Sequence, residues 1–159
     1  MKKIIALALA LVMMLGLVAC GGNGGNAGGD EVTTYNVGVA IYQYNDNFMT
    51  LYRQEIENYF KSLETDTVKY NITMVDGKND MAEQTNQIET FITQKMDVII
   101  CNLVQPSSAE VIIDKVVAAD IPLVLINREP LGETDESYPG IVNKAKVLYV
   151  GADARQSGT

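Results

Sequence analysis

The sequence predicts an α/β domain of three layers, in which helices cover both faces of a doubly wound parallel sheet. Two observations predict this class. Short apolar runs of strand length recur along the chain, and most are followed by a segment whose apolar residues repeat at helical spacing. Strands that are apolar on both faces and alternate with amphipathic helices are typical of buried parallel sheets.

Five strands are expected along the chain. Their ranges are 36–41, 70–75, 98–104, 123–126 and 147–151. The second strand ends at Asp76-Gly77, which is a turn signal. Ile121-Pro122 ends the helix before the fourth strand, because proline cannot continue a helix. The acidic, turn-rich residues 129–140 predict a loop before the fifth strand.

Three helices are expected between these strands. The first spans 46–63, and its apolar stripe is Met49, Tyr52, Ile56, Tyr59, Phe60 and Leu63. The second begins at Asp80, where Glu83 three residues later indicates a capping box. Its stripe is Met81, Thr85, Ile88, Phe91, Ile92 and Lys95. The third opens at residues 106–108, and its inward residues are Ala109, Ile112, Ile113, Val116 and Val117.

The N-terminus has the three-part form of a secretory signal. Lys2-Lys3 precedes an apolar run over residues 4–18, which is shorter than the ~20 residues that span a bilayer. Cys20 directly follows Leu17-Val18-Ala19 and thereby resembles the lipobox of bacterial lipoproteins. That resemblance implies cleavage before Cys20 and a lipid on its sulfur. The alternative is an ordinary signal peptide with a chance cysteine.

The chain is therefore expected to have four parts. Residues 1–19 are a signal peptide, and residues 20–34 are the lipidated cysteine with a linker whose residues 21–29 are only Gly, Asn and Ala. Residues 35–145 form the main domain, whose length suits a single core. Residues 146–159 begin a further unit. The mature protein would be a domain tethered to the outer face of a bacterial membrane.

Composition excludes several classes of function. The whole chain has 12 basic and 20 acidic residues, and removal of Lys2 and Lys3 leaves a mature charge of 10 − 20 = −10. Such an acidic chain without a basic cluster argues against nucleic-acid binding. Histidine is absent, which removes the commonest acid/base group and the commonest metal ligand. Of the two cysteines, Cys101 lies in an apolar strand and is expected to be a small buried hydrophobe.

Candidate binding residues follow the first strand. In parallel sheets ligands bind beyond the carboxyl ends of strands. There Asp46 stands at the start of the first helix, and Phe48 places a ring in its first turn. A carboxylate beside an apolar ring suits a sugar, since the ring packs on C–H groups while the carboxylate accepts hydroxyl protons. The bland alternatives are that Asp46 only caps the helix and that Phe48 anchors the core.

The other strand ends carry polar residues as well. Asn102 lies near the end of the apolar third strand, where an amide without partners would cost free energy. Its side chain either bonds neighbouring backbone or faces the ligand. Asn127-Arg128-Glu129 follows the fourth strand, with an Arg-Glu pair of the kind often found solvated or beside a hinge. No strand end carries a glycine-rich phosphate cradle.

Several segments resemble the periplasmic galactose/glucose-binding proteins in the order of the chain. They are Val37-Gly38-Val39-Ala40-Ile41-Tyr42, Asn45-Asp46-Asn47-Phe48-Met49, Asp80 with Gln84 to Glu89, Asn102-Leu103-Val104 with Pro106, Asn127-Arg128-Glu129-Pro130 and Tyr149-Val150-Gly151-Ala152-Asp153. The resemblance implies that Asp46 and Asn102 hydrogen-bond sugar hydroxyls and that Phe48 packs on one face of the pyranose. It also implies delivery of the sugar to the permease of an ABC importer, with a chemoreceptor that reads the closed form as a further candidate partner.

These proteins close two α/β lobes on the sugar. The resemblance covers the N-terminal lobe and the first strand of the second, so we expect a truncated chain that holds half a site and binds sugar weakly. No cofactor is implied for this lobe, and calcium is implied only for the second lobe of some members. An exposed apolar surface is expected near 147–150.

Three other functions were weighed. A binder of the same fold for ribose, xylose or a signalling furanose stays open, because the second lobe carries half the specificity. A sugar-responsive transcription regulator would need a helix-turn-helix where this chain has a signal peptide and linker. An enzyme using Asp46 and Asp76 as paired carboxylates would lack histidine and any cofactor motif.

Overall fold

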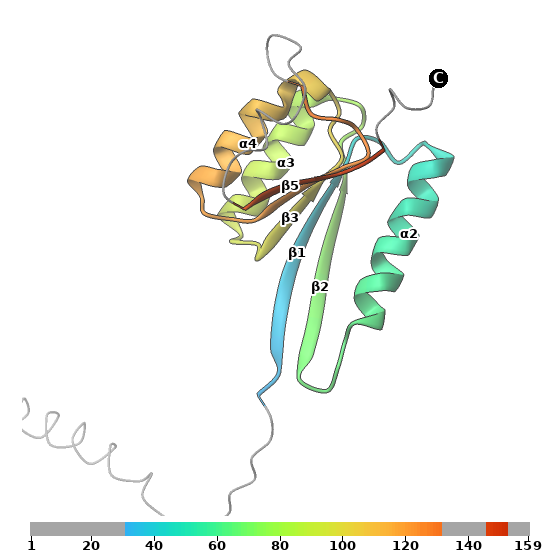
Figure 1. The fold of residues 1–159 in the computed structure, drawn as a ribbon, viewed down its shortest axis with the longest axis vertical. Coiled ribbons are helices and arrows are strands. Elements are labelled where there is room, and N and C mark those ends of the chain that lie inside the picture. The colour runs from blue at the N-terminus through green and yellow to red at the C-terminus, as the bar shows by residue number, and fades with distance from the viewer. Residues whose placement is uncertain (1–30, 132–145, 153–159) are drawn as a thin grey trace, which may run out of the picture. The chain divides into compact units, whose positions relative to one another are not determined.

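The computed structural model describes residues 31–131 and 146–152. The elements are β1 (Thr33–Ile41), α2 (Asn47–Ser62), β2 (Val68–Asp76), α3 (Met81–Thr93), β3 (Val98–Cys101), the 3₁₀ turn η1 (Pro106–Ser108), α4 (Ala109–Ala118), β4 (Leu123–Ile126) and β5 (Val147–Val150) (Figure 1). The predicted signal peptide, Cys20 and its lipid, most of the linker and most of the loop 129–140 lie outside the described residues.

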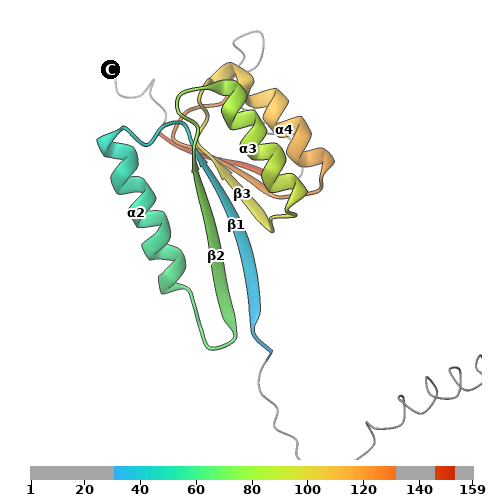
Figure 2. The ribbon, with the colours of Figure 1, turned by 180° about the vertical axis from the view of Figure 1, so that it is seen from behind.

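The five strands form one sheet in the order β2-β1-β3-β4-β5, and every pair is parallel. This confirms the predicted doubly wound parallel sheet. Helix α2 lies on one side of the sheet, and α3 and α4 lie together on the other, as the front and back views show (Figure 1, Figure 2). The chain changes direction across the sheet between β1 and β3, which makes their carboxyl ends the switch point where such folds bind ligands.

Two apolar cores lie on the two sides of the sheet. The side of α3 and α4 holds the larger one, which includes Ile88, Phe91, Ile99, Ile112 and Leu123. The core beside α2 includes Val37, Val39, Ile41, Met49 and Ile126. As predicted, Cys101 is a buried hydrophobe, and burial raises the pKa of its thiol to about 12.

The strands differ from the prediction in several bounds and in the place of the last strand; β2, for example, spans Val68–Asp76 rather than 70–75. β1 begins at Thr33, inside the predicted linker, because Thr33 and Thr34 pair with the start of β2. β3 ends at Cys101, three residues early, because side chains rather than a neighbouring strand bind much of the backbone that follows. Val147–Val150, which we expected to begin a second lobe, completes the first sheet beside β4.

The predicted helical stripes are partly wrong at their ends. Tyr59 and Leu63 on α2 are exposed, as are Met81 on α3 and Lys95 beyond it. The central positions of both stripes pack against the sheet, as predicted. A residue of such a helix is buried only where it faces the sheet: Phe60 packs against the core while its neighbour Tyr59 faces solvent.

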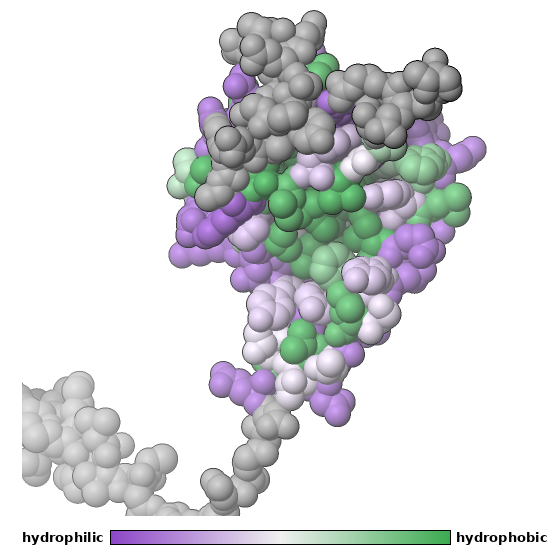
Figure 3. Space-filling view, viewed as in Figure 1, coloured by the Kyte–Doolittle hydropathy of each residue, from purple (hydrophilic) through white to green (hydrophobic). Residues whose placement is uncertain are grey.

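Apolar side chains gather on the face of the sheet beside α2 (Figure 3). Leu148 and Val150 of β5 are 64% and 55% exposed, which confirms the predicted apolar surface near 147–150. Among residues 31–131 and 146–152, no helix is long and apolar enough to cross a bilayer.

Candidate functional site

The candidate site lies at the carboxyl ends of β1, β3 and β4. Asp46 and Phe48 follow β1, Asn102 follows β3, and Arg128 follows β4. Because the three strands are parallel neighbours, their carboxyl ends share one edge of the sheet. The sequence-predicted residues therefore come from adjacent strand ends.

Asp46 is the N-cap of α2, which confirms the capping role that the sequence left open. Its Oδ1 accepts a hydrogen bond of 2.8 Å from the backbone N–H of Met49. Its Oδ2 accepts a hydrogen bond from the hydroxyl of Tyr42. A carboxylate has about four lone-pair positions, so these two bonds leave further acceptor capacity for a ligand.

Phe48 stands in the first turn of α2, and its side chain is solvent-facing. The residue is 57% exposed, and its ring centroid lies 5.8 Å from that of Tyr52 on the same helix. The alternative that Phe48 anchors the core is therefore wrong. This exposed apolar ring, two residues after Asp46 in the chain, is available to pack against a ligand.

Asn102 is fully buried. Its Nδ2 donates to the carbonyl oxygen of Ile126 at 3.2 Å and to Oδ1 of Asn127 at 3.1 Å. The amide donor thus bonds neighbouring groups, which is the first of the two alternatives that the sequence left open for Asn102. Its Oδ1 is buried without a hydrogen-bond partner. An orphaned buried acceptor carries a desolvation cost that a ligand hydroxyl or a water would relieve.

Gln84 of α3, which the sequence analysis did not select, binds the backbone that follows β3. The residue is fully buried; its Nε2 donates to the carbonyl of Asn102 and its Oε1 accepts from the N–H of Val104, both at 2.8 Å. These two bonds replace the strand pairing that the prediction assumed for residues 102–104. Gln84 therefore fixes the turn that carries Asn102.

Arg128 joins the ends of β1, β3 and β4. Its guanidinium carbon lies 3.7 Å from the ring centroid of Tyr42. Its Nη1 donates to the carbonyl oxygens of Leu103 at 3.2 Å and Val104 at 2.5 Å. No local pattern in the sequence indicates this contact, because 86 positions separate Arg128 from Tyr42.

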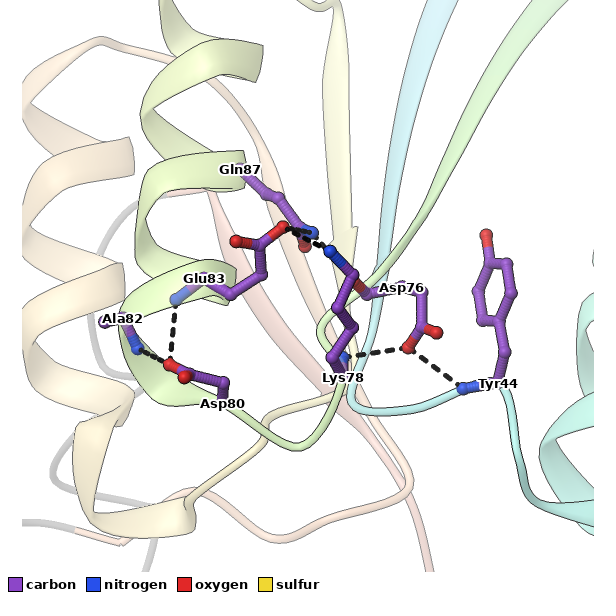
Figure 4. A network of polar contacts seen from close by, with 7 residues as sticks. All are labelled: Tyr44, Asp76, Lys78, Asp80, Ala82, Glu83 and Gln87. Atoms are coloured by element: carbon purple, nitrogen blue, oxygen red, sulfur yellow. Dashed lines mark hydrogen bonds and ion pairs between the residues drawn. The ribbon is translucent and has the colours of Figure 1, made fainter.

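The turn after β2 is held by carboxylates that serve the backbone (Figure 4). Oδ1 of Asp76 accepts from the N–H groups of Tyr44 at 3.0 Å and Lys78 at 2.8 Å. Asp80 caps α3 through the N–H groups of Ala82 and Glu83, as predicted. The reciprocal half of the capping box is absent from this turn, because the N–H of Asp80 donates to the carbonyl of Gly77. Asp76 is therefore a turn residue, as the sequence indicated.

The electrostatics of the site centre on Asp46. The hydroxyl of Tyr42, followed by the N–H of Met49, lowers the pKa of the Asp46 carboxyl below its ordinary value. The same hydrogen bond, with burial, raises the pKa of Tyr42. Asp46 is thus held as an anion and Tyr42 as a neutral donor near pH 7. Among the described residues, no three acidic or cysteine side chains gather where they could hold a metal ion.

Comparison with known proteins gives consistent matches. Residues 37–159 match the family model described as a periplasmic binding protein domain. The D-galactose/methyl-galactoside binding periplasmic protein MglB of Haemophilus influenzae is 31% identical over 134 residues, which are 84% of this chain and 38% of that protein. The ribose import binding protein RbsB of Bacillus subtilis is 25% identical over 80% of this chain and 41% of its own length.

A solved structure from Mycobacterium smegmatis in complex with β-D-fucofuranose has the same fold. It superposes with a TM-score of 0.62 at 20% identity, over 78% of this chain and 36% of that one. The chain spans well under half the length of each of these proteins.

Proposed function

This chain belongs to the family of periplasmic binding protein domains, and on that premise we propose that it is the N-terminal lobe of an extracytoplasmic sugar-binding protein. The longer protein would bind a monosaccharide and deliver it to the permease of an ABC importer. Two α/β lobes joined by a hinge close around a ligand in such proteins. The present lobe would supply one half of the site and needs no cofactor for it.

One observation carries the proposal: an ionised carboxylate and an exposed aromatic ring stand two residues apart at the switch point of the sheet. Asp46 keeps acceptor capacity beyond its two protein hydrogen bonds, and Phe48 is exposed beside it. Sugar hydroxyls donate to carboxylates in charge-assisted bonds, which are about twice as strong as neutral ones. The C–H faces of a pyranose pack against an aromatic ring.

Asn102 takes the third role in the proposed site. Its donor is already used by Ile126 and Asn127, so only the acceptor Oδ1 lacks a partner. We expect a sugar hydroxyl to donate to this oxygen. The expected role is therefore narrower than the pair of donor and acceptor bonds that an asparagine can make.

The proposed ligand is a hexose, D-galactose or D-glucose. It rests on the 31% identity with a protein named for D-galactose and methyl-galactosides, over 84% of this chain. A second candidate is another sugar such as ribose, xylose or a signalling furanose. The similarity to the ribose import protein RbsB favours it, although at the lower identity of 25%.

Location and partners complete the proposal. The signal segment and the cysteine after Leu17-Val18-Ala19 support a protein anchored through a lipid on Cys20 to the outer face of a bacterial membrane. There it would meet the permease of its importer and, in its closed form, a chemoreceptor. Mass spectrometry of the mature N-terminus tests the anchor: an acylated Cys20 is expected, and an unmodified N-terminus elsewhere would contradict it.

Calorimetric titration of the full-length protein with a panel of hexoses and pentoses tests the ligand. Asp46→Asn keeps a good N-cap but removes the charge, and we expect it to weaken hexose binding roughly 10- to 100-fold, the value of a charged hydrogen bond. Asp80→Ala removes the matching cap of α3 and should leave affinity unchanged. A wild-type protein that binds no sugar of the panel would contradict the proposal, as would equal losses in the two variants.

A further inference from the structure

Arg128 and Tyr42 form a continuous chain of contacts that ends on the Asp46 carboxylate. The guanidinium of Arg128 lies over the Tyr42 ring, with its central carbon 3.7 Å from the ring centroid. Cations are attracted to an aromatic face at this distance. The hydroxyl of the same ring donates to Oδ2 of Asp46. Each link therefore restrains the next.

The first member of this chain is itself held by the main chain. Nη1 of Arg128 donates to the carbonyl oxygens of Leu103 and Val104, in the turn that Gln84 fixes from the other side. Tyr42 is only 8% exposed, so its ring has little freedom. Both oxygens of Asp46 have protein donors, which leaves the carboxylate one orientation.

We propose that Arg128 and Tyr42 are positioning residues of the sugar site: Arg128 fixes the Tyr42 ring, and the Tyr42 hydroxyl holds the Asp46 carboxylate ready for the ligand. This inference rests on the proposed function. Neither residue needs to touch the sugar. Their effect is to reduce the conformational entropy that Asp46 would lose when it binds, which is how preorganisation raises affinity.

The charges along the chain agree with this role. Tyr42 donates to Asp46 while Arg128 places a positive charge over the ring of Tyr42, and both groups lower the pKa of Asp46, Tyr42 by the larger amount. The groups that face Tyr42 are thus one anion and one cation. Removal of either partner should let the pKa of Asp46 rise toward the ordinary aspartate value of about 3.9.

The turn that carries Arg128 also contacts the last strand of the sheet. The N–H of its neighbour Asn127 donates to the carbonyl of Val150 in β5 at 2.9 Å. The hydroxyl of Tyr149 donates to the carbonyl of Asn127 at 3.1 Å. The residue that positions the carboxylate therefore belongs to the same turn that holds β5.

Three variants test the proposal. Tyr42→Phe keeps the ring and removes only the hydroxyl. Arg128→Met keeps much of the side-chain length and removes the charge. Arg128→Lys keeps the charge but loses the planar guanidinium, which can stack on a ring and donate several hydrogen bonds. The matched control is Arg53→Met, because Arg53 also stacks on a tyrosine, at 3.8 Å from the ring centroid of Tyr44, and has no described contact with Asp46.

The first measurement is the pKa of Asp46, followed by carbon-13 NMR of its carboxyl carbon in the ligand-free full-length protein. We expect Tyr42→Phe to raise this pKa most, Arg128→Met to raise it less, and Arg53→Met to leave it unchanged. A role limited to stability would shift the unfolding transition without moving the Asp46 titration. An unchanged titration in Tyr42→Phe would overturn the proposal even if Arg128→Met failed to fold.

The second measurement is sugar affinity of the same proteins by calorimetry. Tyr42→Phe and Arg128→Met should weaken binding roughly 5- to 30-fold, the ratio that 1–2 kcal/mol produces, and Arg128→Lys should not restore it. If the wild type binds sugar and these variants bind it equally well, only the positioning roles are overturned. If the wild type binds no sugar, both this inference and the proposed function fail.

Discussion

The two faces of the sheet are covered unequally, although the same strands form both. On the side of α3 and α4, Ile99 and Leu123 are fully buried. On the side of α2, the alternate residues Ile100 and Val124 of the same strands are only half-buried. The difference arises because two helices cover the first face and one helix covers the second (Figure 1, Figure 2).

The incomplete cover leaves an apolar groove of about 490 Å³ between α2 and the strands β3 and β4. It forms part of the apolar surface visible in Figure 3. Its lining residues are Tyr52, Glu55, Ile56, Tyr59, Phe60, Ile100, Val124 and Ile126. Helix α2, which begins next to Asp46 and carries Phe48, thus lies over the less completely covered face of the sheet.

The comparison shows which helices of this lobe are well packed and which are less stably held. The fully buried residues of α3 are Gln84, Ile88 and Phe91, whereas α2 buries only Met49 along its 16 residues. Elements with few buried contacts open at a lower free energy than the rest of a domain. Helix α2, which begins at the candidate residue Asp46, is therefore the more easily displaced helix, and the turn after β3 is anchored by the better-packed face.

The largest expected effect is a difference between two phenylalanines on the two faces. Phe91→Ala removes a fully packed ring from the larger core and should lower the free energy of unfolding by about 3–5 kcal/mol. Phe60→Ala on α2 removes a ring that is only partly buried, so its cost should be less than half as large. Urea unfolding followed by circular dichroism measures both.

The same two variants can also contradict the conclusion that the two faces are packed unequally. Phe60 contacts Tyr70 with ring centroids 5.1 Å apart, so its removal has a definite local effect. Equal losses of stability in the two variants would mean that the α2 face is as well packed as the other. In that case the exposure of Ile100 and Val124 would be a poor guide to local stability.

Gln84→Met is expected to have the next largest effect. Methionine fills a similar volume but leaves the carbonyl of Asn102 and the N–H of Val104 without their partners. Each buried group left unpaired costs about 1–3 kcal/mol, and the bond to Val104 is only part-buried, so a loss of about 2–4 kcal/mol in the free energy of unfolding is expected. Gln94→Met, at an exposed position after α3, should stay within about 0.5 kcal/mol of the wild type.

Thermal unfolding followed by calorimetry compares the two glutamine variants. A loss in Gln84→Met no greater than in Gln94→Met would show that the turn after β3 does not depend on its helical clamp. The firmer face would then not account for how Asn102 is held.

Much of the fold could be predicted from the sequence, because hydrophobic period identifies strands and helices locally. The five parallel strands, the cap at Asp80 and the burial of Cys101 all followed from patterns within a few residues. The groove beside α2 could not be predicted in this way. It depends on how many helices cover each face, and the alternation of Ile99 with Ile100 looks the same whether or not a helix lies above Ile100.

The residues of the candidate site likewise divide into those that a local sequence pattern predicts and those that it does not. The sequence predicts Asp46 and Asn102 as candidates because Asp46 stands in the turn after an apolar strand and Asn102 lies near the end of another. Gln84 was missed because it stands between Glu83 and Thr85 on a helix, where a polar side chain normally faces water. Arg128 was singled out only as half of a charged pair, since its contact with Tyr42 joins strand ends that are distant in the sequence.

The smallest expected effect comes from Leu148 on β5, and its control is the neighbouring residue of the same strand. Successive side chains of a strand point to opposite faces, so Val147 enters the larger core while Leu148 lies in the open. Leu148→Ala should change the free energy of unfolding by less than about 0.5 kcal/mol, whereas Val147→Ala should cost roughly 1–2 kcal/mol. Urea unfolding of the two variants measures both changes in free energy. A cost above that of Val147→Ala for Leu148→Ala would mean that something covers this face in solution, because an exposed leucine has no buried methyl groups to lose.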